Sequence, residues 1–278
     1  MTRIVNNCVA LVCLCLFWGQ SLRAADASHS EQIKWGNESV FNEEHNTLGL
    51  FSGVLGGQIV LAGGTSDDYS RWGRNAVCLS ENAGFALYED VLSKPLAYGA
   101  SITLSDGILC IGGRYSSQCY KDVFFVTMQQ GKLNVSEDWP PLPFPLSNAA
   151  GALLDNKVYL FGGRKSVSPS RLSDSFFVLD LSNKSRGWKE LPGYPGCVRE
   201  DAILVVQNNG VSPCLYLLGG QTETEEGLSS CLTDGYVYNP QLGKWSSLGS
   251  DFPKGICAAV ASGANHIPVS YTHLTLPT

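Results

Sequence analysis

Four pairs of adjacent glycines, spaced at nearly regular intervals, constrain the fold of this chain more than any other feature. Each pair ends a short apolar run, and the runs read QIVLAGG, GILCIGG, KVYLFGG and CLYLLGG. The pairs follow one another at intervals of 49, 50 and 57 residues. A period of this length is typical of repeat architectures, in which one supersecondary unit recurs along the chain. The glycines are therefore first of all expected to shape the backbone of a repeated unit.

Each unit contains the same parts in the same order. A strand rich in small residues precedes the apolar strand, a polar turn such as SDG joins the two, and a third strand such as DVFFVTM follows a variable loop. The unit closes near a tryptophan, at Trp139, Trp188 or Trp245. Four short strands per unit without helical periodicity predict an all-β fold, a β-propeller. We expect the tryptophans to fill the spaces between sheets and the glycines to supply positive φ or close backbone approach.

The repeat also indicates the type of propeller. An apolar strand, Gly-Gly, a Tyr- or Phe-rich strand and a tryptophan form the pattern of a Kelch repeat. The segments KPLAYGASITLSDGILCIGGRYSSQCYKDVFFV and WPPLPFPLSNAAGALLDNKVYLFGG resemble the cyclically permuted mutarotase family, which is similar to bacterial N-acetylneuraminate epimerase. The likeness covers roughly residues 48–265. It implies a propeller of six blades, of which about four and the start of a fifth are present in this chain.

The two ends of the chain differ from the repeats. Residues 1–27 combine a basic start, an apolar run and an A-x-A pattern, which predicts a signal peptide, and residues 28–47 lead into the first blade. Residues 48–267 hold the blades. Residues 268–278 match no strand or repeat pattern and look like translated sequencing-adapter DNA, so we interpret them as a non-native tail and the propeller as truncated at its C-terminal end. We expect the mature protein to be periplasmic or secreted, without a membrane segment.

Composition excludes several classes of function. Charged residues make up 16% of the chain and the net charge is −6, which disfavours nucleic-acid binding because that requires clustered Lys and Arg. The histidines lie only near the ends of the chain, at His29, His45, His266 and His273. A Ser-His-Asp triad, a histidine-rich metal site and a copper oxidase of the galactose-oxidase kind are therefore disfavoured. Without a phosphate-binding or dinucleotide motif, we expect neither a metal nor a cofactor.

Cysteines flank two of the glycine turns. Cys110 and Cys119 lie on either side of one turn, and Cys214 and Cys231 on either side of another. Each pair is placed to bridge neighbouring strands, as disulfides do in exported proteins. The alternative is that these cysteines are small buried hydrophobic residues.

The family resemblance implies an isomerase. Its reaction would be cofactor-free acid–base mutarotation of a sialic acid, interconverting the α and β anomers of N-acetylneuraminate or a related small sugar. Because the family's acid–base residues are expected in the sixth blade, the catalytic residues stay unassigned and we expect the truncated chain to be inactive. Substrate-binding candidates lie at strand ends that face the axis, with Arg199 favoured, and they are Arg199, Arg114, Arg164, Tyr98 and Asn148. The alternative function is a non-catalytic Kelch module that binds a glycan or a protein partner.

Overall fold

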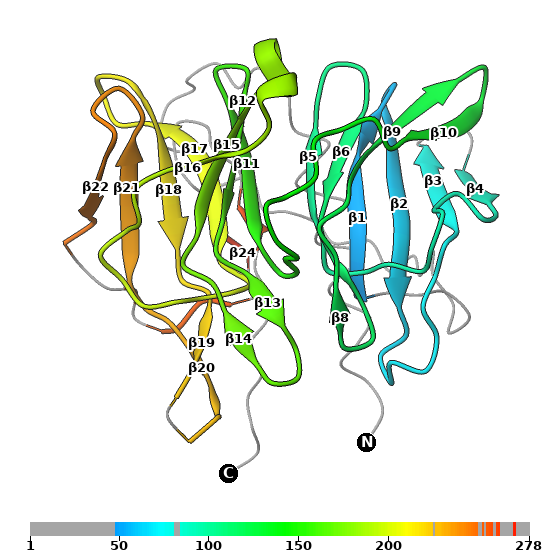
Figure 1. Ribbon diagram of the computed structural model, residues 1–278. Helices are drawn as coiled ribbons and strands as arrows, with labels where there is room; N and C mark the ends of the chain where they lie inside the picture. Colours follow the sequence, from blue (N-terminus) through cyan, green and yellow to red (C-terminus); the bar gives the residue numbers. More distant parts are fainter. Residues whose placement is uncertain are drawn as a thin grey trace, which may run out of the picture.

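The structure is a computed structural model that describes residues 48–80, 84–224, 226–249, 252, 254–257, 260–261 and 269–270. The predicted signal peptide and residues 28–47 lie outside the described residues, as does most of the predicted tail. The described chain is β-structure apart from one 3-10 segment at Leu181–Arg186. Figure 1 shows its sheets standing side by side. No helix among the described residues is long and apolar enough to cross a membrane.

Four antiparallel sheets of four strands each form the blades. Blade one consists of β1 (Leu48–Leu55), β2 (Gln58–Thr65), β3 (Ala76–Ser80) and β4 (Gly84–Tyr88). Blade two consists of β5 (Ala100–Thr103), β6 (Ile108–Ile111), β9 (Val123–Gln129) and β10 (Lys132–Ser136). Blade three consists of β11 (Ala150–Leu154), β12 (Lys157–Phe161), β15 (Phe176–Asp180) and β16 (Lys189–Glu190). Blade four consists of β17 (Ile203–Asn208), β18 (Pro213–Leu218), β21 (Gly235–Asn239) and β22 (Lys244–Ser247).

The first strands of the blades lie next to one another. Strand β1 contacts β5, β5 contacts β11, and β11 contacts β17, so these strands surround the propeller axis. A short pair of strands, β23 (Val260–Ala261) and β24 (Val269–Ser270), follows blade four, and β23 contacts β17. The predicted Kelch-type β-propeller is confirmed, with four blades among the described residues.

The glycine pairs join each blade to the next. All eight glycines have positive φ. A Cβ atom on Gly112 would lie 2.2 Å from the carbonyl oxygen of Leu146, and the N–H of Gly113 donates to that same oxygen at 2.8 Å. Equivalent hydrogen bonds run from Gly64 to Leu96, from Gly163 to Arg199 and from Gly220 to Ile256. Both predicted reasons for glycine, left-handed backbone and close approach, are confirmed.

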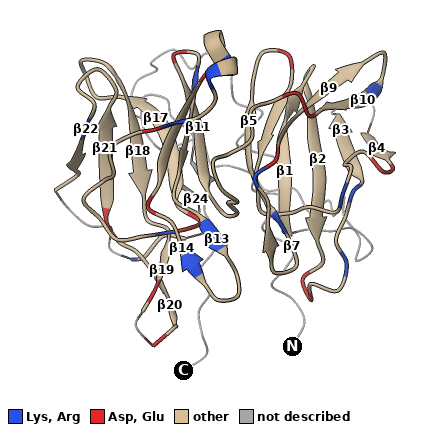
Figure 2. Ribbon diagram, in the orientation of Figure 1, with Lys and Arg blue, Asp and Glu red and all other residues tan. Residues whose placement is uncertain are grey.

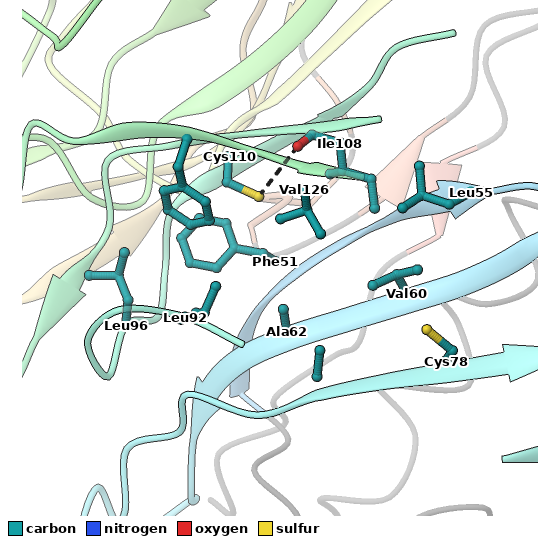
Figure 3. Close-up of a cluster of buried hydrophobic side chains, with 12 residues drawn as sticks. Phe51, Leu55, Val60, Ala62, Cys78, Leu92, Leu96, Ile108, Cys110 and Val126 are labelled. Carbon is teal, nitrogen blue, oxygen red and sulfur yellow. Dashed lines mark hydrogen bonds between the residues drawn. The ribbon is translucent and has the colours of Figure 1, made fainter. Parts of the chain in front are cut away.

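The hydrophobic core lies between neighbouring blades. Phe51 of blade one meets Phe124 of blade two edge to face at 5.3 Å between ring centroids. Figure 3 shows Phe51 within the cluster that these two blades share. Trp245 of blade four packs on Phe161 and Phe176 of blade three. The predicted position of this tryptophan between sheets is thus confirmed, and burial of such rings stabilises the contact between blades.

The cysteine pairing differs from the prediction. Cys110, Cys119 and Cys214 are buried free thiols, and the disulfide joins Cys231 to Cys257. The predicted pairs Cys110–Cys119 and Cys214–Cys231 are wrong, because both cysteines of the first pair are free and Cys231 of the second is bonded to Cys257. Cys110 and Cys214 belong to the blade strands β6 and β18, whereas Cys119 and Cys231 belong to separate hairpins beyond the glycine turns. For Cys110, Cys119 and Cys214, the alternative of buried hydrophobic residues holds.

Candidate functional site

Short hairpins extend from one end of the propeller. After its glycine pair, each of blades two to four forms a small two-stranded hairpin, at the lower end in Figure 1. The hairpins are β7 (Arg114–Tyr115) with β8 (Gln118–Cys119), β13 (Arg164–Ser166) with β14 (Arg171–Leu172), and β19 (Gln221–Glu223) with β20 (Ser229–Cys231). Blade one has the compact loop 66–72 in the corresponding place. The candidates Arg114 and Arg164 are each the first residue of a hairpin.

A belt of four equivalent residues links the blades at this end. Each blade contributes one residue, at or just before the start of its innermost strand, and the four are Gly49, Tyr98, Asn148 and Asp201. All four have φ between 51° and 64°. The N–H of Tyr98 donates to Gly49 O at 2.7 Å, that of Asn148 to Tyr98 O at 2.7 Å, and that of Asp201 to Asn148 O at 3.0 Å. This chain of hydrogen bonds fixes the four residues around the propeller axis.

The belt lines a hollow of about 210 Å³, which we call the axial hollow. Its lining residues are Gly49, Leu50, Tyr98, Gly99, Asn148, Ala149, Asp201 and Ala202. The structure therefore brings the candidates Tyr98 and Asn148 together with Asp201, which sequence reasoning did not select. The available signal was register, since Asp201 precedes its strand as Tyr98 and Asn148 precede theirs.

Asp201 is held from both sides by amide groups. Its Oδ1 accepts a hydrogen bond from Asn148 Nδ2 at 3.0 Å, and its Oδ2 accepts one from Gln221 Nε2 at 2.8 Å. Burial raises the pKa of Asp201 to about 6, helped by the nearby charge of Glu200 and opposed by the two hydrogen bonds. A carboxyl group with such a pKa exchanges protons near neutral pH and is suited to acid–base chemistry.

Arg164 is neutralised by two carboxylates. Its Nε donates to Glu200 Oε2 at 2.8 Å, and its Nη2 donates to Glu223 Oε1 at 2.9 Å. The hydrogen bond to Glu200 raises the pKa of the guanidinium further above its usual range. Figure 2 shows the basic residues of β13 and β14 near the acidic residues of the β19–β20 hairpin. Arg164 therefore ties neighbouring blades together at this end of the propeller.

Arg199, the favoured candidate in the sequence, has another position. Its side chain is completely buried, and its Nη1 donates to Gly219 O at 2.7 Å. Nη1 and Nη2 form a bidentate pair with Asp234 at 2.7 and 2.8 Å, and Nε donates to Tyr194 Oη at 2.8 Å. Because all three nitrogens are engaged by protein groups and the side chain is buried, the guanidinium is not presented to the axial hollow. The geometry gives Arg199 a structural role instead of the expected contact with substrate.

Arg114 has no carboxylate partner among the described residues. Its Nη1 donates to Ser116 O at 2.7 Å. Its guanidinium carbon lies 4.4 Å from the ring centroid of Tyr98, 5.3 Å from that of Trp72 and 5.6 Å from that of Tyr69. The described residues contain no cluster of His, Cys, Asp and Glu suited to a metal. The chemistry available at this end is thus a titratable carboxyl group at the axial hollow and an arginine surrounded by aromatic rings.

Part of the propeller is similar in sequence to known proteins. Residues 139–269 match the family model described as N-acetylneuraminate epimerase. The N-acetylneuraminate epimerase of Yersinia pestis (strain Pestoides F) is 30% identical over 129 residues, which are 46% of this chain and 30% of that protein. The enzyme of that name from Haemophilus influenzae (strain PittEE) is 31% identical over 131 residues, 47% of this chain and 32% of that protein. Residues 139–269 of the propeller are therefore similar to the N-acetylneuraminate epimerases.

Two further matches agree on the propeller. This chain is 31% identical over 121 residues to a Kelch domain-containing protein of Vibrio cholerae, covering 43% of the chain and 31% of that protein. A solved structure entitled "Structure of YjhT" superposes with a TM-score of 0.61 at 15% identity, covering 77% of this chain and 73% of that one. That structure shares the fold. The aligned segment spans about a third of the length of the curated epimerases it matches.

Proposed function

We propose that the complete gene product is a carbohydrate mutarotase that interconverts the α and β anomers of N-acetylneuraminate or a related acidic sugar without a cofactor. The match of residues 139–269 to the epimerase family carries this proposal. The matched segment includes Asn148, Asp201 and Gln221, the hydrogen-bonded group at the axial hollow. The matched segment therefore contains Asp201, a carboxyl group whose raised pKa suits acid–base catalysis near neutral pH.

The reaction needs a base and an acid. The base removes the proton of the anomeric hydroxyl, the carbonyl bond forms at the anomeric carbon, and the bond to the ring oxygen breaks as an acid protonates that oxygen. Rotation and reclosure of the open-chain ketone on its other face give the opposite anomer and return both protons. The reaction as written needs no redox change and no cofactor.

We assign Asp201 as the base. Both of its oxygens accept hydrogen bonds from neutral amides, an arrangement that holds the carboxylate in place while burial keeps its pKa high enough to accept a proton. Burial raises the pKa of Tyr98, so its phenol stays protonated, and it donates a hydrogen bond to Tyr69 Oη at 3.3 Å. The group that protonates the ring oxygen remains a prediction and is expected outside the described blades.

The test follows freshly released α-N-acetylneuraminate by proton NMR. We expect the complete gene product to accelerate equilibration, with a rate that rises as pH increases through about 6, where Asp201 loses its proton. Asp201→Asn should lower the acceleration by about 10²–10⁴-fold, the usual contribution of a general base. Asp174→Asn, at an exposed carboxylate, is the matched control and should retain the rate. No acceleration by the unaltered protein would refute the mutarotase proposal.

The second candidate function is a non-catalytic Kelch module that binds a glycan or a protein. The likeness over 121 residues to the Vibrio cholerae Kelch domain-containing protein supports the Kelch module of this candidate. Binding of sugar without accelerated anomerisation would support this alternative.

We also propose that the protein is exported to the periplasm or the exterior. The predicted signal peptide at residues 1–27 supports this, as does the disulfide between Cys231 and Cys257, since disulfides persist in oxidising compartments. Recovery of the protein in the periplasmic fraction, with residues 1–27 removed, is the expected result.

A further inference from the structure

Arg114 is the centre of a cluster of aromatic side chains between blades one and two. We call Arg114 with Tyr69, Trp72, Tyr98 and Tyr115 the Arg114 platform. The ring of Trp72 meets that of Tyr115 at 5.5 Å and that of Tyr98 at 6.5 Å between centroids, both edge to face. Tyr69 and Tyr115 are 48% and 44% exposed, so part of the platform faces solvent.

The charge of Arg114 is available to a ligand. Arg164 and Arg199 are each paired with carboxylates of the protein, whereas Arg114 contacts aromatic rings and one carbonyl oxygen. Aromatic faces attract a guanidinium, but they leave its charge without a counter-ion. A planar guanidinium in this state is suited to a ligand carboxylate, which it binds through two parallel hydrogen bonds.

The loop that carries two of the rings is held in place before any ligand arrives. Thr65 Oγ1 donates to Arg71 O at 2.7 Å, and the N–H of Tyr69 donates to Ser66 O at 3.0 Å. The carboxylate of Asp68 accepts hydrogen bonds from Ser66 and Ser70. Together these bonds, that from Ser66 above all, lower the pKa of Asp68 to about 2. Asp68 is therefore turned into its own loop and does not neutralise Arg114. A pre-ordered loop reduces the entropy cost of binding.

Tyr98 connects the platform to the axial hollow. Its ring lies against Arg114, and the same residue lines the hollow together with Asn148 and Asp201. A ligand held at Arg114 would therefore extend toward the Asp201 carboxyl group along the side of Tyr98. Rings and an unpaired guanidinium are complementary to a sugar that has both an apolar face and a carboxylate.

We propose that the Arg114 platform is the binding site for the carboxylate of an acidic sugar. Arg114 pairs with the carboxylate, and the exposed rings pack against the apolar face of the sugar. The choice of N-acetylneuraminate as probe rests on the proposed function, but the charge preference does not.

The experiment compares a charged sugar with its neutral ester. Calorimetric titration of the complete gene product with N-acetylneuraminate and with its methyl ester should show about tenfold or more tighter binding of the acid, the usual effect of a hydrogen-bonded charge pair. Arg114→Gln should remove this preference. Arg171→Gln, at an exposed arginine of the β13–β14 hairpin, is the matched control and should keep it.

Each result separates the platform from the mutarotase activity. Equal affinity of the unaltered protein for acid and ester, or a preference that survives Arg114→Gln, overturns the proposal. If Arg114→Gln does not fold, Arg114→Lys serves instead, because it keeps the charge and loses the planar fork, and it should weaken the preference without abolishing it. Charge-selective binding without accelerated anomerisation would support the platform and refute only the mutarotase proposal.

Discussion

At the scale of single residues, three arginines that look alike in the sequence have three different surroundings. Arg199 is buried with Asp234, Arg164 is paired with Glu200 and Glu223, and Arg114 lies against aromatic rings. Arg114 and Arg164 each follow a glycine pair and Arg199 precedes an innermost strand, a position that favoured Arg199 as the substrate contact in the sequence but does not show what surrounds its side chain. The partners decide the roles, and these partners come from elsewhere in the chain, as Asp234 does for Arg199.

Gly112 provides a test of backbone approach at a single residue. Gly112→Ala should lower the free energy of unfolding by about 2–4 kcal/mol, because the new methyl group adds a clash with Leu146 O to the cost of positive φ. Gly131→Ala is the control, since Gly131 has φ of 73° but a Cβ atom there would meet no other atom within 4 Å. Urea denaturation of both variants measures the difference. Equal losses would mean that positive φ alone requires the glycine.

At the scale of elements, the hairpins beyond the glycine turns place the candidate site. Gln221 of β19 reaches Asp201 of the preceding segment, and Arg164 of β13 reaches Glu223 of β19. The second of these contacts crosses from blade three to blade four, so the hairpins also join the blades. Blade one departs from the repeat at its loop 66–72, and that departure supplies Tyr69 and Trp72 to the Arg114 platform.

The pair formed by the buried Arg199 and the partly exposed Asp234 is expected to hold blade four together. Arg199→Ala leaves Asp234 without its charge partner and should lower the free energy of unfolding by about 3–5 kcal/mol. The measurement is chemical denaturation, with Arg171→Gln as a control at an exposed position. If the variant folds, its preference for acid over ester should be unchanged. A lost preference with normal stability would restore Arg199 as a substrate contact.

At the scale of the whole molecule, the disulfide links blade four to the segment that follows it. Cys231 lies in β20, and Cys257 lies 26 residues further along the chain. Replacing both by serine should lower the free energy of unfolding by about 3 kcal/mol, because a closed loop of this length restricts the unfolded chain. Cys197→Ser, at an exposed free cysteine, should have little effect. A double variant as stable as the original would show that the blade contacts suffice without the bond.

The repeat, the all-β propeller and the structural use of the glycine pairs could all be predicted from the sequence alone. These follow from local periodicity and from backbone sterics, which act over a few residues and recur every 49 to 57 residues. The cysteine pairing, the burial of Arg199 and the meeting of Tyr98, Asn148 and Asp201 became visible only in the folded chain. These features depend on contacts between residues far apart in the sequence, which meet only when the blades fold and pack around the axis. The repeat pattern in the sequence is compatible with several such sets of contacts.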